Sequence, residues 1–475
     1  MGTSSKKPMA GALRAGCLNF TELSAISVAN IGPTIVAALI IPLMYANAGN
    51  ASWLAYLFGT VMLLFVTFNL NQFARRSAAT GSMHAYTVMG LGATTGGISG
   101  WCLVWAYLFD GIAAVAGFAI FGNALLGMLG VQVPNMLMFA ILCFAIWFLA
   151  YEDVQISSIV MLLLEALSIT MILILCAMVL SKHKFALDTA QLSLKGSSLS
   201  GIAMGVNIAV FSLVGFENAT AFGEEAKEPL VTIPRVLIVN LVLTGLFFVL
   251  MSYTEILGFI GYKTPLDKVD TPLNILAQVV GMPALVVPLS LAVVVSCFSG
   301  GLACLNSGAR ILYSLSHHGL LHSSVGAAHD THETPHVAVT IMGALLFVVP
   351  AAMLLVPGTQ PFDVVGYAGT LTAFGFIGAY FLVSVAAPAY LKHQGLVRGR
   401  DYALAGVAAL LLLFPAVGSV YPVPAWPYSV FPYIFLAYMT IGLFWIRARR
   451  KGISEFAGVD RPAPVVAPVE GDTSN

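Results

Sequence analysis

Four polar side chains interrupt apolar stretches of this chain that are long enough to cross a membrane. They are Asn30, Asp110, Glu165 and Glu217, and no Lys or Arg lies in the stretches that hold Asp110 and Glu165. A carboxylate in the hydrocarbon layer is unfavourable by a few kcal/mol unless it faces a partner or a polar cavity. Acids in this setting suit two kinds of chemistry, binding of a cationic group and reversible binding of a proton. These residues therefore predict a solute site inside the membrane.

The neighbours of each acid suggest a role for it. Glu165 is at the middle of residues 160–170, and we interpret it as a proton-coupling residue, with a buried, hydrogen-bonded structural carboxyl as the alternative. Asp110 is a second coupling candidate, and the aromatic residues around it either form a cage for a cationic group or simply pack. Glu217 either faces the amine of a solute or caps a helix through free amides. The flanking aromatic residues are Trp101, Trp105, Tyr107 and Phe109.

Two apolar segments are broken near their middles. Residues 22–46 contain Gly32 and Pro33, and residues 199–223 contain Gly215. Proline removes an amide donor and clashes with the carbonyl four residues back. Two segments broken at equivalent places, five segments apart, predict a transporter built from inverted repeats. The alternative is that Gly32 and Pro33 only kink a packed helix.

The breaks predict complementary binding groups. In the first, the amides of Thr34, Ile35 and Val36 would be free and suit an anion, whereas the carbonyls before Gly215 suit a cation. An α-amino acid carries both charges. Because Pro33 removes one amide, an amine without a carboxylate, such as ethanolamine or a diamine, is the alternative. The candidate solute-binding residues are Asn30, Ile31, Gly32, Thr34, Ile35, Phe211, Ser212, Leu213, Gly215 and Glu217.

The composition predicts an all-α polytopic membrane protein. Of 475 residues, 59% are hydrophobic and 9% are charged, against about 25% charged in soluble domains. Two of the predicted segments are long enough to be strongly tilted or to include an extra half-helix, namely 83–122 and 284–316. The twelve predicted membrane segments are 22–46, 50–74, 83–122, 133–151, 156–180, 199–223, 233–259, 284–316, 337–356, 361–387, 403–421 and 428–447.

Charge and segment order predict the organisation of the chain. Sixteen Lys and Arg fall on one side of the membrane and five on the other, which predicts that both termini are cytoplasmic. Glu255, near the outer end of the seventh segment, is expected to reach the interface. The predicted regions are an N-terminal tail (1–18), two five-helix repeats (19–183 and 199–390), helices 11 and 12 (402–450) and a disordered cytoplasmic tail (451–475).

Two motifs resemble those of the amino acid–polyamine–organocation (APC) superfamily. Residues 215–229, GFENATAFGEEAKEP, and the Ile-Pro-Arg at 233–235 resemble its sixth-segment signature. Residues 73–86 and 96–101 resemble its polar link into the third segment. With the segment plan, the resemblance covers residues 18–450.

The resemblance implies a leucine-transporter (LeuT) type of fold. Many members have a Gly- and Ser-rich run at the first break, where this chain has Asn30-Ile-Gly-Pro33. In some members a lysine near the position of Glu165 is taken to replace a sodium ion, so the resemblance implies a coupling role with the charge reversed.

The expected function is secondary transport of a small amine-containing solute, most simply an amino acid, with the bundle of segments 1, 2, 6 and 7 rocking against a scaffold. Coupling to protons or exchange is expected, as is an integral, multi-pass location in a lipid bilayer.

A solute sensor on the same fold and a membrane enzyme are the other classes of function. No HExxH, GxSxG or Walker A motif occurs, so no enzyme, cofactor or metal is expected, and zero net charge suggests no nucleic acid. Six histidines between 317 and 336 are interpreted as a solvated loop.

Overall fold

The computed structural model describes residues 18–77, 82–152, 158–222, 226–327 and 334–449. These residues form helices and connecting turns, and their one β-type contact is an isolated bridge between Leu18 and Ala226. Residues 1–17 of the tail predicted at 1–18 lie outside the described residues, as does the tail predicted at 451–475. The acids Glu224 and Glu225 and the histidines His329 and His332 lie outside them too. The all-helical fold class predicted from the composition is confirmed for the part of the chain that the structure describes.

Ten helical stretches among the described residues are long and apolar enough to cross a membrane. Phe20–Ala74 is a single stretch of 55 residues that contains the first two predicted segments, and Asn135–Tyr151 is apolar but shorter. Large apolar side chains point outward along these helices, as they do where a protein surface contacts lipid. Examples with more than half of their surface exposed are Leu163, Leu243, Leu291, Leu410 and Phe444.

The helices follow the predicted segments closely, with the first and sixth segments divided. The long predicted segment 83–122 contains an extra half-helix, because Gly92 separates α5 from α6 with φ +85°. By contrast, 284–316 corresponds to one long helix, α13. The main helices are α1 (Phe20–Ile31), α2 (Pro33–Ile35), α3 (Ile41–Ala48), α4 (Ser52–Ala74), α5 (Ser82–Leu91), α6 (Ala93–Met128), α7 (Asn135–Tyr151), α8 (Ser158–Lys182), α9 (Thr189–Leu192), α10 (Leu199–Leu213), α11 (Pro229–Gly258), α12 (Pro272–Val279), α13 (Val286–His317), α14 (His336–Leu354), α15 (Pro361–His393), α16 (Gly399–Gly418) and α17 (Phe431–Ala448).

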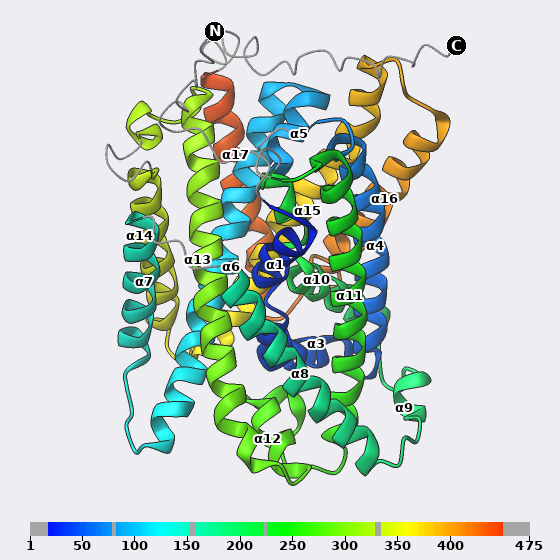
Figure 1. Ribbon diagram of the computed structural model, residues 1–475, viewed down its shortest axis with the longest axis vertical. Helices are drawn as coiled ribbons and strands as arrows, with labels where there is room; N and C mark the ends of the chain where they lie inside the picture. Colours follow the sequence, from blue (N-terminus) through cyan, green and yellow to red (C-terminus); the bar gives the residue numbers. More distant parts are fainter. Residues whose placement is uncertain (1–17, 78–81, 153–157, 223–225, 328–333, 450–475) are drawn as a thin grey trace, which may run out of the picture.

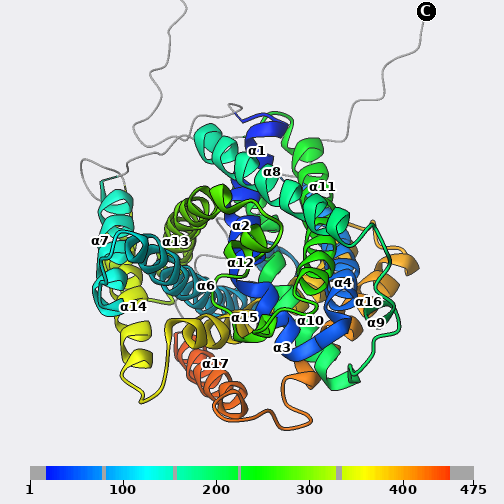
Figure 2. The same cartoon turned by 90° about the horizontal axis from the view of Figure 1, so that it is seen from below.

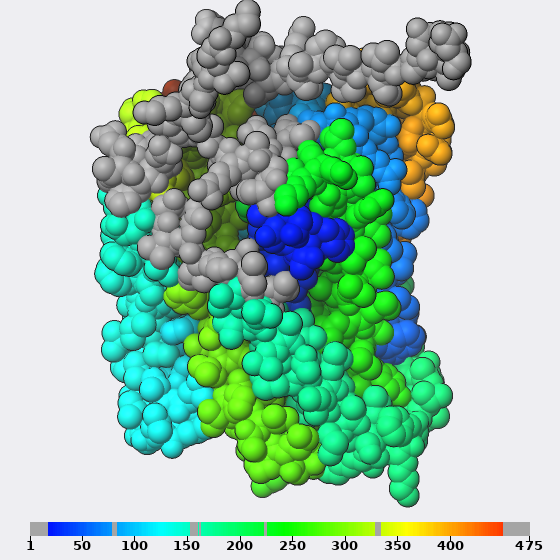
Figure 3. Space-filling model, viewed as in Figure 1, coloured from blue at the N-terminus to red at the C-terminus, as the bar shows by residue number. Residues whose placement is uncertain are grey.

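Figure 1 shows how the helices are arranged in the bundle. Helix α1 begins at the edge of the bundle and leads inward to α2, which lies near the centre (Figure 2). Helix α6 packs against α13 and α15, and α1 contacts α8, α11 and α13. Helix α10 packs against α4 and α15, while α7 and α14 form a pair at the periphery (Figure 2). In Figure 3 the first described residues (dark blue) reach the surface beside α11, and α8 covers the chain below them. The breaks in α1 and α10 are thus surrounded by other helices.

Candidate functional site

The first break is a sharp change of direction at one glycine. Helix α1 ends at Ile31, and Gly32 adopts φ +60° and ψ 59°, a left-handed conformation that glycine adopts without strain. Pro33 then starts α2, where its missing amide costs nothing because the first turn of a helix has no partner for it. The next turn, Val36–Ile40, is a π-helix, a form that is frequent at functional sites.

The second break lies directly against the first. Helix α10 ends at Leu213, and Gly215 has φ +100° before a 3-10 helix, η3, continues at Phe216–Phe222. A Cβ atom on Gly215 would lie 2.7 Å from Asn30 Nδ2 and 3.0 Å from the amide nitrogen of Ile31. The predicted breaks are therefore both present, and a glycine lets them touch.

Substituting Gly215 with alanine should destabilise the protein by at least about 2 kcal/mol, because both the positive φ and the contact with α1 oppose a side chain. The matched control is Gly261→Ala, at φ +77° with no atom within 4 Å of its Cβ. Melting in detergent should show a clearly larger loss for Gly215→Ala. Equal losses would mean that only backbone strain matters and that the breaks do not need close contact.

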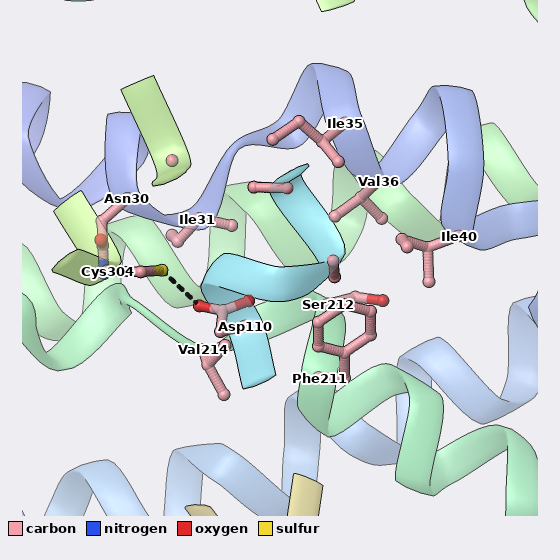
Figure 4. A pocket seen from close by; sticks show the side chains of 13 residues that line it. Asn30, Ile31, Ile35, Val36, Ile40, Asp110, Phe211, Ser212, Val214 and Cys304 are labelled. Atoms are coloured by element: carbon pink, nitrogen blue, oxygen red, sulfur yellow. Dashed lines mark hydrogen bonds between the residues drawn. The ribbon is translucent and has the colours of Figure 1, made fainter. Parts of the chain in front are cut away.

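A cavity lies where the two breaks meet (Figure 4). The space available to the centres of water molecules is about 30 Å³, which is room for about two waters. An amino acid is larger, so the cavity must widen to admit one. The lining residues are Asn30, Ile31, Ile35, Val36, Ile40, Asp110, Ala113, Ala114, Phe211, Ser212, Val214, Gly300 and Cys304.

The polar groups of this cavity favour a cation. The Asp110 carboxylate points into it and accepts a hydrogen bond from Cys304 Sγ at 3.2 Å. Both side-chain polar atoms of Asn30 are buried without a hydrogen-bond partner in the described structure. No Lys, Arg or His belongs to the lining. An amine would meet an acid and an amide here, and an apolar group would meet aliphatic side chains.

Glu165 caps the half-helix that follows the first break. Its Oε1 accepts hydrogen bonds from the Thr34 amide at 2.8 Å and from Thr34 Oγ1 at 2.7 Å. Ser296 Oγ, on α13, donates to Oε2 at 3.1 Å. The carboxyl is buried and lies outside the cavity lining. It thus connects α2 on one side to α8 and α13 on the other.

The expectation that the amides of Thr34, Ile35 and Val36 are free is wrong for this conformation. Glu165 binds the first, and the carbonyl of Gly32 accepts from Ile35 at 2.9 Å and from Val36 at 3.2 Å. A buried amide without a partner is costly. The chain's own acid and a tight turn satisfy these donors where a solute anion was expected.

Glu217 lies behind the second break. Its Oε2 accepts from the Gly215 amide and from the Tyr380 hydroxyl, each at 3.1 Å, and Tyr107 donates to Oε1 at 3.5 Å. The side chain is 2% exposed and does not line the cavity. This geometry matches the alternative in which Glu217 binds backbone at the break.

Half of the predicted site residues line the cavity. They are Asn30, Ile31, Ile35, Phe211, Ser212 and Asp110, while Gly32, Thr34, Leu213, Gly215, Glu217 and Glu165 form or support the breaks. Some lining residues were not predicted. Ala113 and Ala114 follow Asp110 by one helical turn and so share its helix face, which is the sequence signal that indicates them. Gly300 and Cys304 come from α13, and no sequence signal connects that helix to the breaks.

The aromatic residues around Asp110 do not line the cavity. Trp105 Nε1 donates to the Leu371 carbonyl at 2.8 Å, and Trp101 stacks on Tyr438 with ring centroids 4.9 Å apart. The packing alternative therefore describes them. Among the described residues no group of three His, Cys, Asp or Glu side chains is placed to hold a metal ion.

Known proteins match most of this chain. The sequence model of the amino acid permease family matches residues 22–447. The branched-chain amino acid permease BcaP of Bacillus subtilis is 22% identical over 369 residues, which is 73% of this chain and 75% of that protein. The low-affinity putrescine importer PlaP of Escherichia coli K12 is 24% identical over 338 residues, with 70% and 71% covered.

The fold also matches a solved structure. The crystal structure of MhsT in complex with L-phenylalanine superposes with a TM-score of 0.58 at 12% identity. The match covers 83% of this chain and 98% of the MhsT chain, and at this identity it shows a shared fold.

Proposed function

This chain belongs to the amino acid permease family, and from that premise we propose that it is a secondary transporter that moves a small amine-bearing solute, an amino acid in the first place, by alternating access. The observation that supports this most directly is the cavity at the two breaks, with the Asp110 carboxylate in it and no basic residue in its lining. An ammonium group there replaces its lost hydration with an ion pair and with the carbonyls at the end of α10. The aliphatic lining suits an apolar side chain.

We infer that the chain crosses the membrane twelve times and that segments 1–5 and 6–10 form two inverted repeats. The support is the equivalent position of the breaks, Gly32 in the first segment and Gly215 in the sixth. In transporters of this kind the solute binds near mid-membrane between the repeats. A second cavity shares Phe211 with the first, so rotation of that ring would join the two cavities.

Solute counterflow tests this function. Purified protein in liposomes preloaded with unlabelled L-leucine should take up labelled L-leucine, and protein-free liposomes should not. The paired competitor is 3-methylbutylamine, which is leucine without its carboxylate. A transporter for amino acids exchanges leucine, and the amine competes weakly. Absence of exchange with leucine, the amine and putrescine would favour a non-transporting sensor.

An amine without a carboxylate is the second candidate. The observation that favours it is the occupation of the Thr34 amide by Glu165, because that amide was the expected anion site. If only the amine competes, Asp110 dominates recognition and the solute does not need to displace Glu165 from Thr34. If only leucine competes, Glu165 must leave Thr34 when the solute binds.

We propose that transport is coupled to protons through Glu165. The carboxyl connects α2, in the bundle expected to move, to α8 and to Ser296 of α13 in the scaffold. Binding of a proton would remove the charge that attracts the Thr34 amide and would loosen this connection. Proton binding and movement of the bundle would then be linked.

Both termini are proposed to face the cytoplasm, from the distribution of Lys and Arg. The five cysteines in the described chain are buried, so Cys17→Ser gives a background with little reactivity. On it, Asn47→Cys should react with an impermeant thiol reagent in intact cells, and Gln394→Cys only after lysis. Both native side chains are exposed. Equal labelling in intact cells would contradict this orientation.

A further inference from the structure

A further buried acid, Glu255, has no hydrogen-bond partner in the part of the chain that the structure describes. It lies in the last two turns of α11 and is 0% exposed. Neither Oε1 nor Oε2 has a hydrogen-bond partner among the described residues. An ionised carboxylate that is buried and unpaired is strongly unfavourable, whereas the neutral acid loses much less on burial. This environment holds Glu255 with its proton.

The groups around Glu255 are weak acids and neutral side chains. Tyr56 on α4 and Cys176 on α8 are titratable groups of two helices that pack against α11. Cys176 Sγ is itself 3.2 Å from Thr254 Oγ1. The charged residues of the other described elements that pack on α11 are held elsewhere: Glu22 by Asn19, Glu165 by Thr34, Lys182 by the Val279 carbonyl and Glu217 by Tyr380. Among the described residues, therefore, no cation is hydrogen-bonded to Glu255.

Tyr56 lies between the helix that holds Glu255 and the solute cavity. Its ring is 5.5 Å from that of Phe248 on α11, and Phe248 and Glu255 are seven residues apart, so they share one face of that helix. The hydroxyl of Tyr56 lies 3.1 Å from Ser212 Oγ, and Ser212 lines the cavity in the turn before the second break. A charge that appears on Glu255 acts on the Tyr56 hydroxyl, and any shift of that hydroxyl acts on Ser212. The three residues come from α11, α4 and α10, which belong to the bundle expected to move.

We propose that Glu255 is a second proton-binding site of this transporter, linked to the solute cavity through Tyr56 and Ser212. This inference rests on the proposed transport function. In the present conformation the acid keeps its proton. When the bundle moves away from α8, which packs against α11 in this conformation, water enters. The O–H bond then breaks, the proton passes to water, and a solvated carboxylate remains. The reverse step restores the neutral acid before the bundle closes.

Glu255 differs from Glu165 in what each can do. Glu165 accepts three hydrogen bonds, which stabilise a carboxylate, so its charge can persist in the closed state. Glu255 accepts none, so closing the bundle over it requires a proton. The two sites therefore make separate contributions to the pH dependence of transport.

The test compares Glu255→Gln with Asp267→Asn, a control at the same end of the molecule that is partly exposed and paired with Lys268 at 3.7 Å. Proteoliposomes are assayed with labelled L-leucine, or with labelled 3-methylbutylamine if the wild type exchanges only the amine. For Glu255→Gln we expect counterflow at equal pH to stay within about twofold of wild type, and accumulation driven by a pH gradient to fall at least about tenfold. The Asp267→Asn control should retain both the counterflow and the accumulation of the wild type.

The outcomes separate this inference from the proposed function. Wild-type protein that shows no counterflow contradicts transport itself. If Glu255→Gln accumulates solute with an unchanged pH profile, the second proton site does not exist. If Glu255→Gln does not fold, the test uses Tyr56→Phe, which removes only the hydroxyl that faces Ser212. The pH midpoint of solute binding should then shift. An unchanged midpoint overturns the proposed link between Glu255 and the solute cavity.

Discussion

Replacing Asp110 with asparagine should reduce counterflow of the labelled solute by at least about a hundredfold, because a desolvated ion pair that loses one partner costs about 3 kcal/mol. Asp110 is the acid in the cavity lining, and the lining contains no base. Asparagine has nearly the same shape and still accepts the hydrogen bond from Cys304. We therefore expect the fold to survive and solute affinity to fall.

The control for this prediction is Cys304→Ala, which removes the hydrogen bond to Asp110 and keeps the charge. Its effect on affinity should be within about tenfold, as expected for one neutral donor. Dissociation constants from thermal shift, with melting temperatures recorded without solute, separate binding from stability. If Asp110→Asn binds and exchanges as the wild type does, the amine is held by the carbonyls at the end of α10 and not by this carboxylate.

The parts of the site that depend on local chemistry were predictable from the sequence. Glycine and proline are the residue types that most readily interrupt a helix, and both of the breaks predicted at Gly32–Pro33 and Gly215 are present. Burial of polar groups in apolar segments indicated Asn30 and Asp110, and both line the cavity. These features follow from the properties of the individual residue types, so they can be predicted without knowing which distant residues they contact.

The partners of the acids were not predictable in this way. The segment of Glu165 contains no basic residue to pair with it, and its donors are instead the amide and hydroxyl of Thr34, 131 positions away. Glu255 was expected to reach the interface and is fully buried. Other parts of the chain cover that end of α11. Gln191 Nε2 donates a hydrogen bond to the Tyr253 carbonyl at 3.1 Å, and α12 packs alongside. Such contacts are set by tertiary packing.

Replacing Glu165 with glutamine should abolish accumulation driven by a pH gradient and leave exchange measurable. Glutamine cannot release or bind a proton in the transport cycle, yet its Oε1 still accepts from the Thr34 amide. Ser296 must then reverse its hydrogen bond, because the Nε2 group donates and does not accept. The measurement is accumulation and counterflow in one set of proteoliposomes over a range of pH. Accumulation with an unchanged pH profile would make Glu165 a structural cap.

The same variant also reports whether Glu165 competes with a solute carboxylate for Thr34. A hydrogen bond to a charged acceptor contributes about 1.5–3 kcal/mol and a neutral one about 1 kcal/mol, so glutamine releases the Thr34 amide more easily. If an amino acid must displace this side chain, Glu165→Gln should bind L-leucine up to about tenfold more tightly, with no gain for 3-methylbutylamine. Ser296→Ala, which weakens the hold on Glu165 and retains the acid, should shift leucine affinity in the same direction by less. Equal changes for leucine and the amine would show that the Thr34 amide is never offered to the solute, and that recognition rests on the amine end alone.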